Sequence, residues 1–311
     1  MKLLTLLLLL GVTSLTESEV IQSFNGQCPD FFIPNYRTSK KVITPTVFEG
    51  AQYKQICQIL EEDVGPCRKK SIYRYATLYD TSRRIPVYSA YTFHTKVESP
   101  QDHRWKVEPQ LDETCSSGNR GMRVATATDK FEKQALNEDY SENYPPYTRG
   151  HLFPKSYAAD QKQVDSTFTL TNAAPQREDS NNEWAKQVED PMLKDINNSC
   201  TLDKNNSAYI VTGVVPGEKW LPIKRGNRNI DQGVNIPTHF WTAFTCVSKL
   251  GRIYRAHLAQ QNYPLKNDHF SKFIKYNVTI DQLEMKLTDL YKESLKKERK
   301  ERFTVFSIPK A

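Results

Sequence analysis

Residues 147–184 read YTRGHLFPKSYAADQKQVDSTFTLTNAAPQREDSNNEW, and the rest of the chain is interpreted around them. An Arg-Gly-His triplet at residues 149–151 opens the stretch, and a Thr-Asn-x-x-Pro-Gln pattern follows at residues 171–176. Asn181 then stands where a helix is expected to begin, with Trp184 on its apolar face. The stretch therefore combines an imidazole, a guanidinium and amide side chains at short spacings.

The sequence around this stretch predicts a mainly antiparallel sheet. Aromatic and β-branched runs indicate strands at residues 71–79, 86–93, 208–215, 240–247 and 253–258. The first two strands form one hairpin and the last two form another, because only short polar or Gly-containing turns separate them. We therefore predict an α+β fold in which helices flank a mixed, mainly antiparallel sheet of about six strands.

Two helices can be predicted from local signals. Thr279 is a candidate N-cap, and Gln282 completes a capping box before apolar residues at helical spacing. The charged residues 292–302 continue this helix as a solvated face. The helix that begins near Asn181 is expected to end or kink at Pro191.

Composition indicates a folded, exported protein with a polyanionic partner. Of the 311 residues, 38% are hydrophobic and 25% are charged, which is typical of a core-forming domain. The formal net charge of +7 favours a partner that carries phosphates. No repeat or linker divides the chain, so we predict one domain over residues 19–303 and a tail over residues 304–311.

The N-terminus predicts a secretory signal over residues 1–18, because Lys2 precedes an apolar run too short to span a membrane. Six cysteines suit the extracellular compartment and suggest disulfides, but the sequence does not choose among their pairings. Candidate N-glycosylation triplets begin at Asn197, Asn205 and Asn277. We expect the mature protein to be secreted.

The central stretch holds side chains suited to phosphodiester hydrolysis, a reaction that needs a base for water and positive charge at the phosphate. His151 is the candidate base, and Arg149 is a permanent cation suited to phosphate oxygens. The amide of Asn181 suits a hard cation such as Mg²⁺, which keeps several waters. Each residue also has a simpler interpretation: a lone His is more often packed or exposed than catalytic, and Asn181 could be only a helix cap.

Taken together, these motifs resemble the DNA/RNA non-specific endonuclease family, which carries a ββα-metal (His-Me finger) active site. The resemblance rests on the triplet, on the Asn-x-x-Pro-Gln pattern, and on Asn181 nine residues after Asn172. Further runs at residues 75–79, 85–91, 108–111 and 234–237 resemble the secreted vertebrate branch, the endonuclease domain-containing 1 proteins. The likeness spans roughly residues 28 to 291.

The resemblance implies a role for each residue of the metal site. His151 would be the general base, and Asn181 would be the one direct protein ligand of Mg²⁺, with Mn²⁺ as a second candidate ion. Glu189 keeps the family's spacing to Asn181 and would hold a metal-bound water. Trp184 comes one residue earlier than the usual spacing, so Asn182 is a rival to Asn181.

The resemblance also implies roles for residues around the phosphate. Arg149 would brace the phosphate, Asn172 would position the site from its turn, and Arg104 would stabilise the transition state. His103 is the alternative to Arg104 if the loop shifts by one residue. One departure concerns Thr148, which stands where the family usually has Asp, so a carboxylate is missing from the motif.

These expectations define one function and one alternative. The first is a secreted, metal-dependent, sugar-non-specific endonuclease that hydrolyses DNA and RNA, with a homodimer as a candidate assembly. The alternative is a catalytically weak or inactive glycoprotein with a nuclease fold, which binds nucleic acid or a protein partner. Thr148 motivates the alternative.

Overall fold

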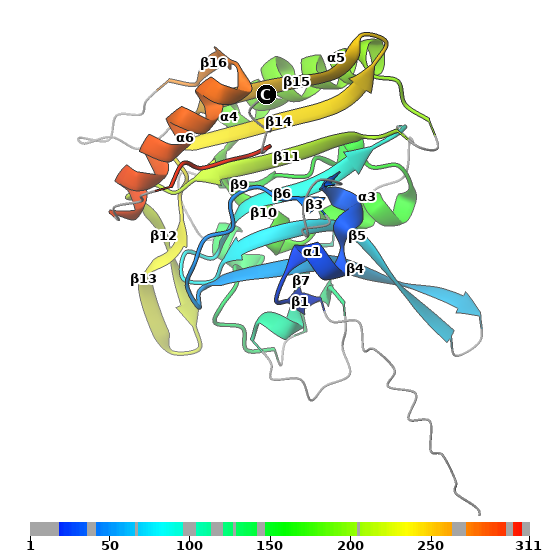
Figure 1. Ribbon diagram of the computed structural model, residues 1–311. Coiled ribbons are helices and arrows are strands. Elements are labelled where there is room, and N and C mark those ends of the chain that lie inside the picture. The colour runs from blue at the N-terminus through cyan, green and yellow to red at the C-terminus, as the bar shows by residue number, and fades with distance from the viewer. Residues whose placement is uncertain are drawn as a thin grey trace, which may run out of the picture.

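An eight-stranded antiparallel sheet forms the centre of the molecule (Figure 1). The computed structural model describes residues 19–35, 42–65, 68–95, 104–112, 121–126, 129–141, 147–203, 206–262, 272–296 and 301–306. The strands follow the order β1 (Val20–Ile21), β4 (Tyr53–Gly65), β5 (Arg68–Asp80), β6 (Ile85–Phe93), β11 (Ala208–Val215), β14 (His239–Ser248), β15 (Gly251–Gln260) and β16 (Ile274–Val278). The α+β prediction is confirmed, with eight strands in the sheet rather than about six.

Both predicted hairpins are present. Strands β5 and β6 pair directly across the turn at residues 81–84, and β14 pairs with β15 from His239 to Gln260. Strand β11 has the predicted bounds and joins the two hairpins by pairing with β6 on one side and β14 on the other. Strands β1, β4 and β16, which the sequence patterns did not indicate, complete the sheet.

Four two-stranded ribbons and several short helices surround this sheet. The ribbons are β2–β3 (Ile33–Pro34, Val42–Ile43), β7–β8 (Lys106–Val107, Arg123–Val124), β9–β10 (Tyr147–His151, Ala173–Arg177) and β12–β13 (Trp220–Arg225, Arg228–Asn235). The helices are α1 (Phe24–Gln27), α2 (Glu138–Ser141), α3 (Gln161–Thr167), α4 (Glu178–Trp184), α5 (Asp190–Ser199) and α6 (Ile280–Leu295), with a π-helical segment, Ala185–Glu189, between α4 and α5.

One face of the sheet packs against both ends of the chain. Helix α6 begins with the predicted capping box and buries Leu283 and Leu287 against the sheet. It ends at Leu295, earlier than predicted, because Lys296 adopts a left-handed conformation (φ 49) that turns the chain back. Residues 301–306 then return to the same core, where Val305 is fully buried. The packed structure therefore continues beyond residue 303.

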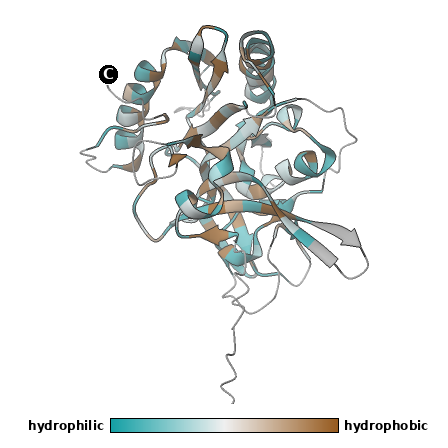
Figure 2. Ribbon diagram, turned by 45° about the vertical axis from the view of Figure 1, so that its right-hand side comes forward, coloured by the Kyte–Doolittle hydropathy of each residue, from teal (hydrophilic) through white to brown (hydrophobic). Residues whose placement is uncertain are grey.

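The other face of the sheet carries ribbon β9–β10 and the helical segment α4–α5, which lie behind the sheet in Figure 1. Tyr91 of β6 stacks on Phe153, just after β9, with ring centroids 4.1 Å apart. Met192 and Ile196 of α5 pack into the same hydrophobic cluster. Figure 2 shows the hydrophobic residues concentrated along the central strands that these elements cover.

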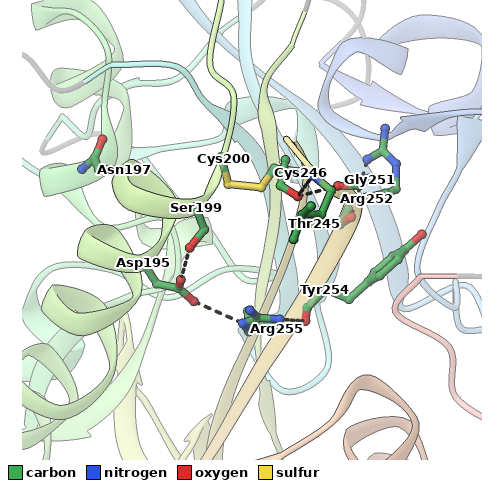
Figure 3. Close-up of a disulfide and its surroundings, with 12 residues drawn as sticks. Asp195, Asn197, Ser199, Cys200, Thr245, Cys246, Gly251, Arg252, Tyr254 and Arg255 are labelled. Carbon is green, nitrogen blue, oxygen red and sulfur yellow. Dashed lines mark hydrogen bonds and ion pairs between the residues drawn. A yellow bond between two sulfur atoms is a disulfide. The ribbon is translucent and has the colours of Figure 1, made fainter.

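Two disulfides lie within the described residues. Cys28 bonds to Cys57 and joins the N-terminal segment to β4, and Cys200 bonds to Cys246 and joins the end of α5 to β14 (Figure 3). Cys67 and Cys115 lie outside the described residues. Among the described helices, none is both long and apolar enough to cross a membrane.

Candidate functional site

Ribbon β9–β10 and helix α4 form a ββα unit that carries the central motifs. Residues 147–151 pair antiparallel with residues 173–177, so that Gly150 lies opposite Ala174. Because side chains alternate along a strand, Arg149 and His151 point to one face of the ribbon. Thr148 and Gly150 point to the other face, which α4 covers. The two halves of the predicted site thus approach the same ribbon from opposite faces.

His151 lies in an aromatic pocket at the end of β9. Its ring centroid is 4.9 Å from that of Trp105 and 4.9 Å from that of Phe168. Burial, and secondarily the charge of Lys155, lower the pKa of His151 to about 3, although the backbone of Arg149 partly opposes the shift. Nε2 is enclosed and has no hydrogen-bond partner in the described part of the chain. The imidazole is therefore neutral near pH 7, although this low pKa makes it a weak base while no anion is bound nearby.

Arg149 is held between two aromatic rings on the same face as His151. Its guanidinium carbon lies 5.6 Å from the Trp105 centroid and 5.4 Å from the Tyr140 centroid. Nη2 donates to the carbonyl of Asn137 at 2.9 Å. Burial lowers the pKa of Arg149, which an anionic ligand would oppose by stabilising the charged form. The indole of Trp105 thus contacts both Arg149 and His151.

The expected second arginine, Arg104, is exposed and directly precedes Trp105. Its backbone carbonyl accepts a hydrogen bond from Lys106 Nζ at 3.4 Å. The alternative residue, His103, lies outside the described residues. The role of Arg104 therefore stays a prediction.

Asn172 is fully buried, and its side chain hydrogen-bonds to β6, to Phe153 after β9 and to the end of α3. Oδ1 accepts from Ser89 Oγ and from the backbone N–H of Phe153, both at 2.9 Å. Nδ2 donates to the carbonyls of Phe153 at 3.1 Å and Thr167 at 3.0 Å. Its amide is thus fully used inside the protein. This arrangement agrees with a positioning role and leaves no amide atom to contact substrate.

Asn181 faces the ribbon from α4, whereas its rival Asn182 is exposed. Asn181 Nδ2 donates to Thr148 Oγ1 at 3.2 Å. No described group donates a hydrogen bond to Asn181 Oδ1. Of the two asparagines, Asn181 alone thus places its side chain against β9.

The face of the ribbon under α4 also holds an unsatisfied amide. Gln176 is 1% exposed, and neither Oε1 nor Nε2 has a partner among the described residues. It packs on Gly150, where an added Cβ would lie 2.3 Å from Gln176 Oε1. Buried polar groups without a protein partner usually contact water or an ion.

These observations fit a hydrated hard cation. No group of three or more His, Cys, Asp or Glu in the described residues is arranged to hold a metal ion. On the α4 face of the ribbon, Asn181 and Gln176 instead carry amide oxygens that accept no hydrogen bond from the described residues. Amide oxygens combined with several waters suit Mg²⁺ or Mn²⁺ and do not suit Zn²⁺, which takes His and Cys.

The helix that carries Asn181 was predicted to end or kink at Pro191; it does not end there, but its regular winding is interrupted just before that residue. Pro191 lies in the first turn of α5, and the π-helical segment Ala185–Glu189 precedes it. Because Pro191 has no N–H, it cannot bond the carbonyl of Gln187. Lys275 Nζ on β16 donates to that carbonyl at 2.8 Å instead.

The π-helical segment also changes the direction of Glu189. In a regular α-helix, eight residues would separate Asn181 and Glu189 by roughly 80° around the axis. Each residue of a π-helical turn advances by roughly 80–85° rather than about 100°. Over five residues the difference nearly cancels the 80°, so Asn181 and Glu189 lie on similar sides of the helix.

Glu189 is set in a largely apolar environment. Burial raises the pKa of Glu189 to about 7, and the indole of Trp184 lowers this pKa in part. Trp184 Nε1 nevertheless makes no hydrogen bond of ordinary geometry with the described residues. Tyr157 donates to the backbone carbonyl of Glu189 at 2.7 Å. A buried carboxyl of this kind gains from a nearby cation, which stabilises its charged form.

Four residues of the site could not be assigned from the sequence: Trp105, Tyr140, Phe168 and Gln176. The only sequence signal for Trp105 was its position next to Arg104, and Gln176 was part of a recognised motif without a role. The contacts of all four are long-range, so no local periodicity could reveal them.

Comparisons with known proteins agree with this geometry. The family model described as DNA/RNA non-specific endonuclease matches residues 65–296. A human endonuclease domain-containing 1 protein is 31% identical over 225 residues, covering 71% of this chain and 39% of the relative. The mouse protein of the same name is 28% identical over 245 residues, covering 76% and 43%. The chain thus spans about two fifths of the length of these relatives.

A solved structure of the EndoG/EndoGI complex also matches, with a TM-score of 0.43 and 19% identity over 70% of this chain and 82% of that one. The family assignment rests on the model match, which includes ribbon β9–β10, α4 and most of the sheet. The chain therefore belongs to the DNA/RNA non-specific endonuclease family.

Proposed function

We propose that the chain is a secreted, metal-dependent endonuclease that hydrolyses phosphodiester bonds of DNA and RNA without selecting the sugar. The observation that carries the proposal is the ββα unit itself. It holds a neutral imidazole, His151, on one face of a ribbon and the Asn181 amide, with its unpaired Oδ1, on the other. Gly150 lies on β9 between Thr148 and His151, and Gln176 packs against it on the α4 face.

In this proposal His151 takes the proton from the attacking water, because its imidazole is neutral at physiological pH. Arg149 contacts the phosphate and neutralises charge as the transition state forms. Trp105 and Tyr140 keep the Arg149 guanidinium in place by ring contacts. Asn172 holds β9 and β10 in register without touching the reacting atoms.

Asn181 would be the direct protein ligand of Mg²⁺ or Mn²⁺, and Glu189 would hold a metal-bound water. When bound, such an ion supplies charge stabilisation at the phosphate and at the departing oxygen. Ionised Glu189 would favour the ion, and binding of the ion would lower the pKa of Glu189 from about 7.

The choice of DNA and RNA as substrates is supported by charge. The net charge of +7 favours polyanions, and contacts to phosphate do not read base sequence. Arg104 stays a candidate for a second phosphate contact because it is exposed beside Trp105.

Secretion and glycosylation are supported by the disulfides and by the position of the glycosylation triplets. Asn197 is exposed near the end of α5, next to the Cys200–Cys246 disulfide (Figure 3). Asn277 is exposed on β16, whereas Asn205 lies outside the described residues. Sixteen residues of helix separate Asn197 from Asn181, roughly 24 Å along the axis. A glycan on Asn197 would therefore leave the site open.

The test is cleavage of supercoiled plasmid and of single-stranded RNA by purified protein with Mg²⁺. We expect both substrates to be cleaved, EDTA to stop cleavage, and His151→Ala to lower the rate at least 100-fold, as is typical for loss of a general base (~10²–10⁴). His94→Ala is the matched control, because His94 is an exposed histidine at the end of β6 and should leave the rate unchanged. Undiminished cleavage by His151→Ala would contradict the proposal.

The same assay separates the alternative function, which Thr148 favours by removing a carboxylate from the motif. A nuclease-fold binding protein would retard nucleic acid in a salt-sensitive manner without cleaving it. Retention with no metal-dependent products would therefore support the alternative.

A further inference from the structure

The hydroxyl of Thr148 connects β9, β10 and α4 at one point. Thr148 Oγ1 donates its hydrogen to the carbonyl of Gln176 at 2.8 Å. A hydroxyl has one hydrogen, so toward Asn181 it can only accept. The Asn181 atom 3.2 Å from Thr148 Oγ1 must therefore be the amide nitrogen, and Oδ1 must point elsewhere.

We propose that Thr148 is a positioning residue that sets the orientation of the Asn181 amide, so that Oδ1 is presented to the metal ion. The inference rests on the proposed function, because it assumes that Asn181 is the metal ligand. It assigns to the Thr148 hydroxyl a task that does not require a carboxylate.

Orientation matters here because the site offers one direct protein ligand. An amide has nearly the same shape in its two orientations, but one presents an oxygen and the other presents an NH₂ group, which a cation repels. In a site with several carboxylates, a misplaced amide would be compensated. Among the described residues no such cluster exists, so in the proposed site the orientation of the Asn181 amide decides whether its direct ligand is present.

The local structure makes Thr148 suited to this task. It is the second residue of the paired strand β9, where a β-branched side chain has few rotamers. Its acceptor, the Gln176 carbonyl, belongs to the residue directly opposite on β10. The hydroxyl is thus fixed by two strands, and α4 is fixed to them through Asn181. Such outer contacts to a metal ligand commonly change metal affinity about 10–100-fold.

The test compares Thr148→Val, which keeps the β-branched shape, with Thr148→Ser, which keeps the hydroxyl. Binding of Mn²⁺ to the full chain is measured by electron paramagnetic resonance without nucleic acid, with Asn181→Ala as the reference for loss of the ligand. We expect Thr148→Val to bind about 10-fold or more weakly and Thr148→Ser to bind close to wild type. Thermal unfolding of each variant shows whether the fold is retained, and Thr148→Ala replaces Thr148→Val if the latter does not fold.

A second readout separates positioning from a general structural effect. If Thr148 only orients the ligand, the Mg²⁺ concentration for half-maximal cleavage rises in Thr148→Val, while the rate at saturating Mg²⁺ returns close to wild type. Wild-type affinity in Thr148→Val, with affinity lost in Asn181→Ala, would overturn this inference and leave the proposed function intact. If wild type and Asn181→Ala bind Mn²⁺ equally, the metal site of the proposed function fails and this inference fails with it.

Discussion

A buried pair of carboxyl groups makes folding stability depend on pH in a way that one substitution should remove. Glu19 and Glu108 are both 0% exposed, and they lie close enough for each carboxyl group to shift the pKa of the other. Burial, followed by the charge of Glu108, raises the pKa of Glu19 well above its ordinary value of 4.5. One Oε2 atom on each residue lacks any other partner, which is consistent with a proton held between them.

The remaining contacts of the pair explain which residue keeps the proton. Glu108 Oε1 accepts from the hydroxyls of Thr169 and Thr171 at 3.0 and 3.1 Å, and Lys106 also favours its charge. Glu19 Oε1 accepts from the N–H of Ile59 at 3.2 Å, and the backbone of Met122 adds a smaller contribution that favours the charged form. Glu108 is therefore the better anion, and Glu19 is the protonated donor.

The size of the pH effect follows from the difference in proton binding between the folded and the unfolded chain. Above pH 4.5 the unfolded chain has lost the Glu19 proton, while the folded chain still holds it. The free energy of unfolding therefore falls by about 1.4 kcal/mol per pH unit until the raised pKa is reached. In Glu19→Gln the amide can still donate to Glu108, but the proton that Glu19 takes up on folding is removed. From pH 5.5 upward the variant should gain stability relative to wild type by up to about 1.4 kcal/mol per pH unit, until the raised pKa of Glu19 is passed.

The assay is urea unfolding followed by tryptophan fluorescence at pH 5.5, 6.5 and 7.5, with the disulfides intact. The difference between variant and wild type cancels the contributions of other titrating groups. Glu293→Gln, at an exposed position on α6, should give a curve parallel to that of wild type. A difference between Glu19→Gln and wild type that stays constant across the three pH values would refute the shared proton.

Three further substitutions probe the site and its support. Gly150→Ala should lower both the cleavage rate and the melting temperature, because the new Cβ would lie 2.3 Å from the Oε1 atom and 2.8 Å from the Cβ atom of buried Gln176. Gly26→Ala, which has open space, is the control in the same two measurements. Arg225→Met should lower the free energy of unfolding by roughly 3–5 kcal/mol, because it leaves the Asp139 carboxylate buried without its two hydrogen bonds of 2.7 Å. Urea unfolding measures this loss. A smaller loss when Asp139→Asn is added would show that the unpaired charge of Asp139 causes it. Asn172→Ala should cost roughly 2–4 kcal/mol in the same measurement, because four buried groups lose their partners.

The parts of the fold that could be predicted were those with local signals. The hairpins β5–β6 and β14–β15 combine aromatic or β-branched runs with short turns, and α6 carries a capping box. Strand β4 has comparable length but includes polar residues such as Gln58, which is buried only because Thr77 and Thr171 accept its hydrogen bonds. Those partners are distant in sequence, so no local pattern indicated them.

In the candidate site, the sequence indicated which residues take part but not how their side chains are oriented. Sequence motifs indicated His151, Asn172 and Asn181, and the structure brings them to one ribbon and its covering helix. The direction of Glu189 could not be predicted, because the regular helical period does not apply across a π-helical turn. The role of Thr148 was also hidden, since a missing carboxylate suggests loss until the two hydrogen bonds of the hydroxyl are seen.

The π-helical segment Ala185–Glu189 has the character of a one-residue insertion in an otherwise continuous helix. The disulfide at Cys200 fixes the far end of that helix, so the number of residues between Asn181 and Cys200 sets how α4 meets the ribbon. Because five residues at roughly 80–85° turn the chain about as far as four at about 100°, deleting one residue from the segment would restore regular α-helix and leave Asn181 facing Thr148. Deleting one residue from the regular part of α5 would instead turn Asn181 by about 100° about the axis. Every residue of the site would remain, yet the amide would leave Thr148. In this part of the chain, length is as much a functional property as residue identity.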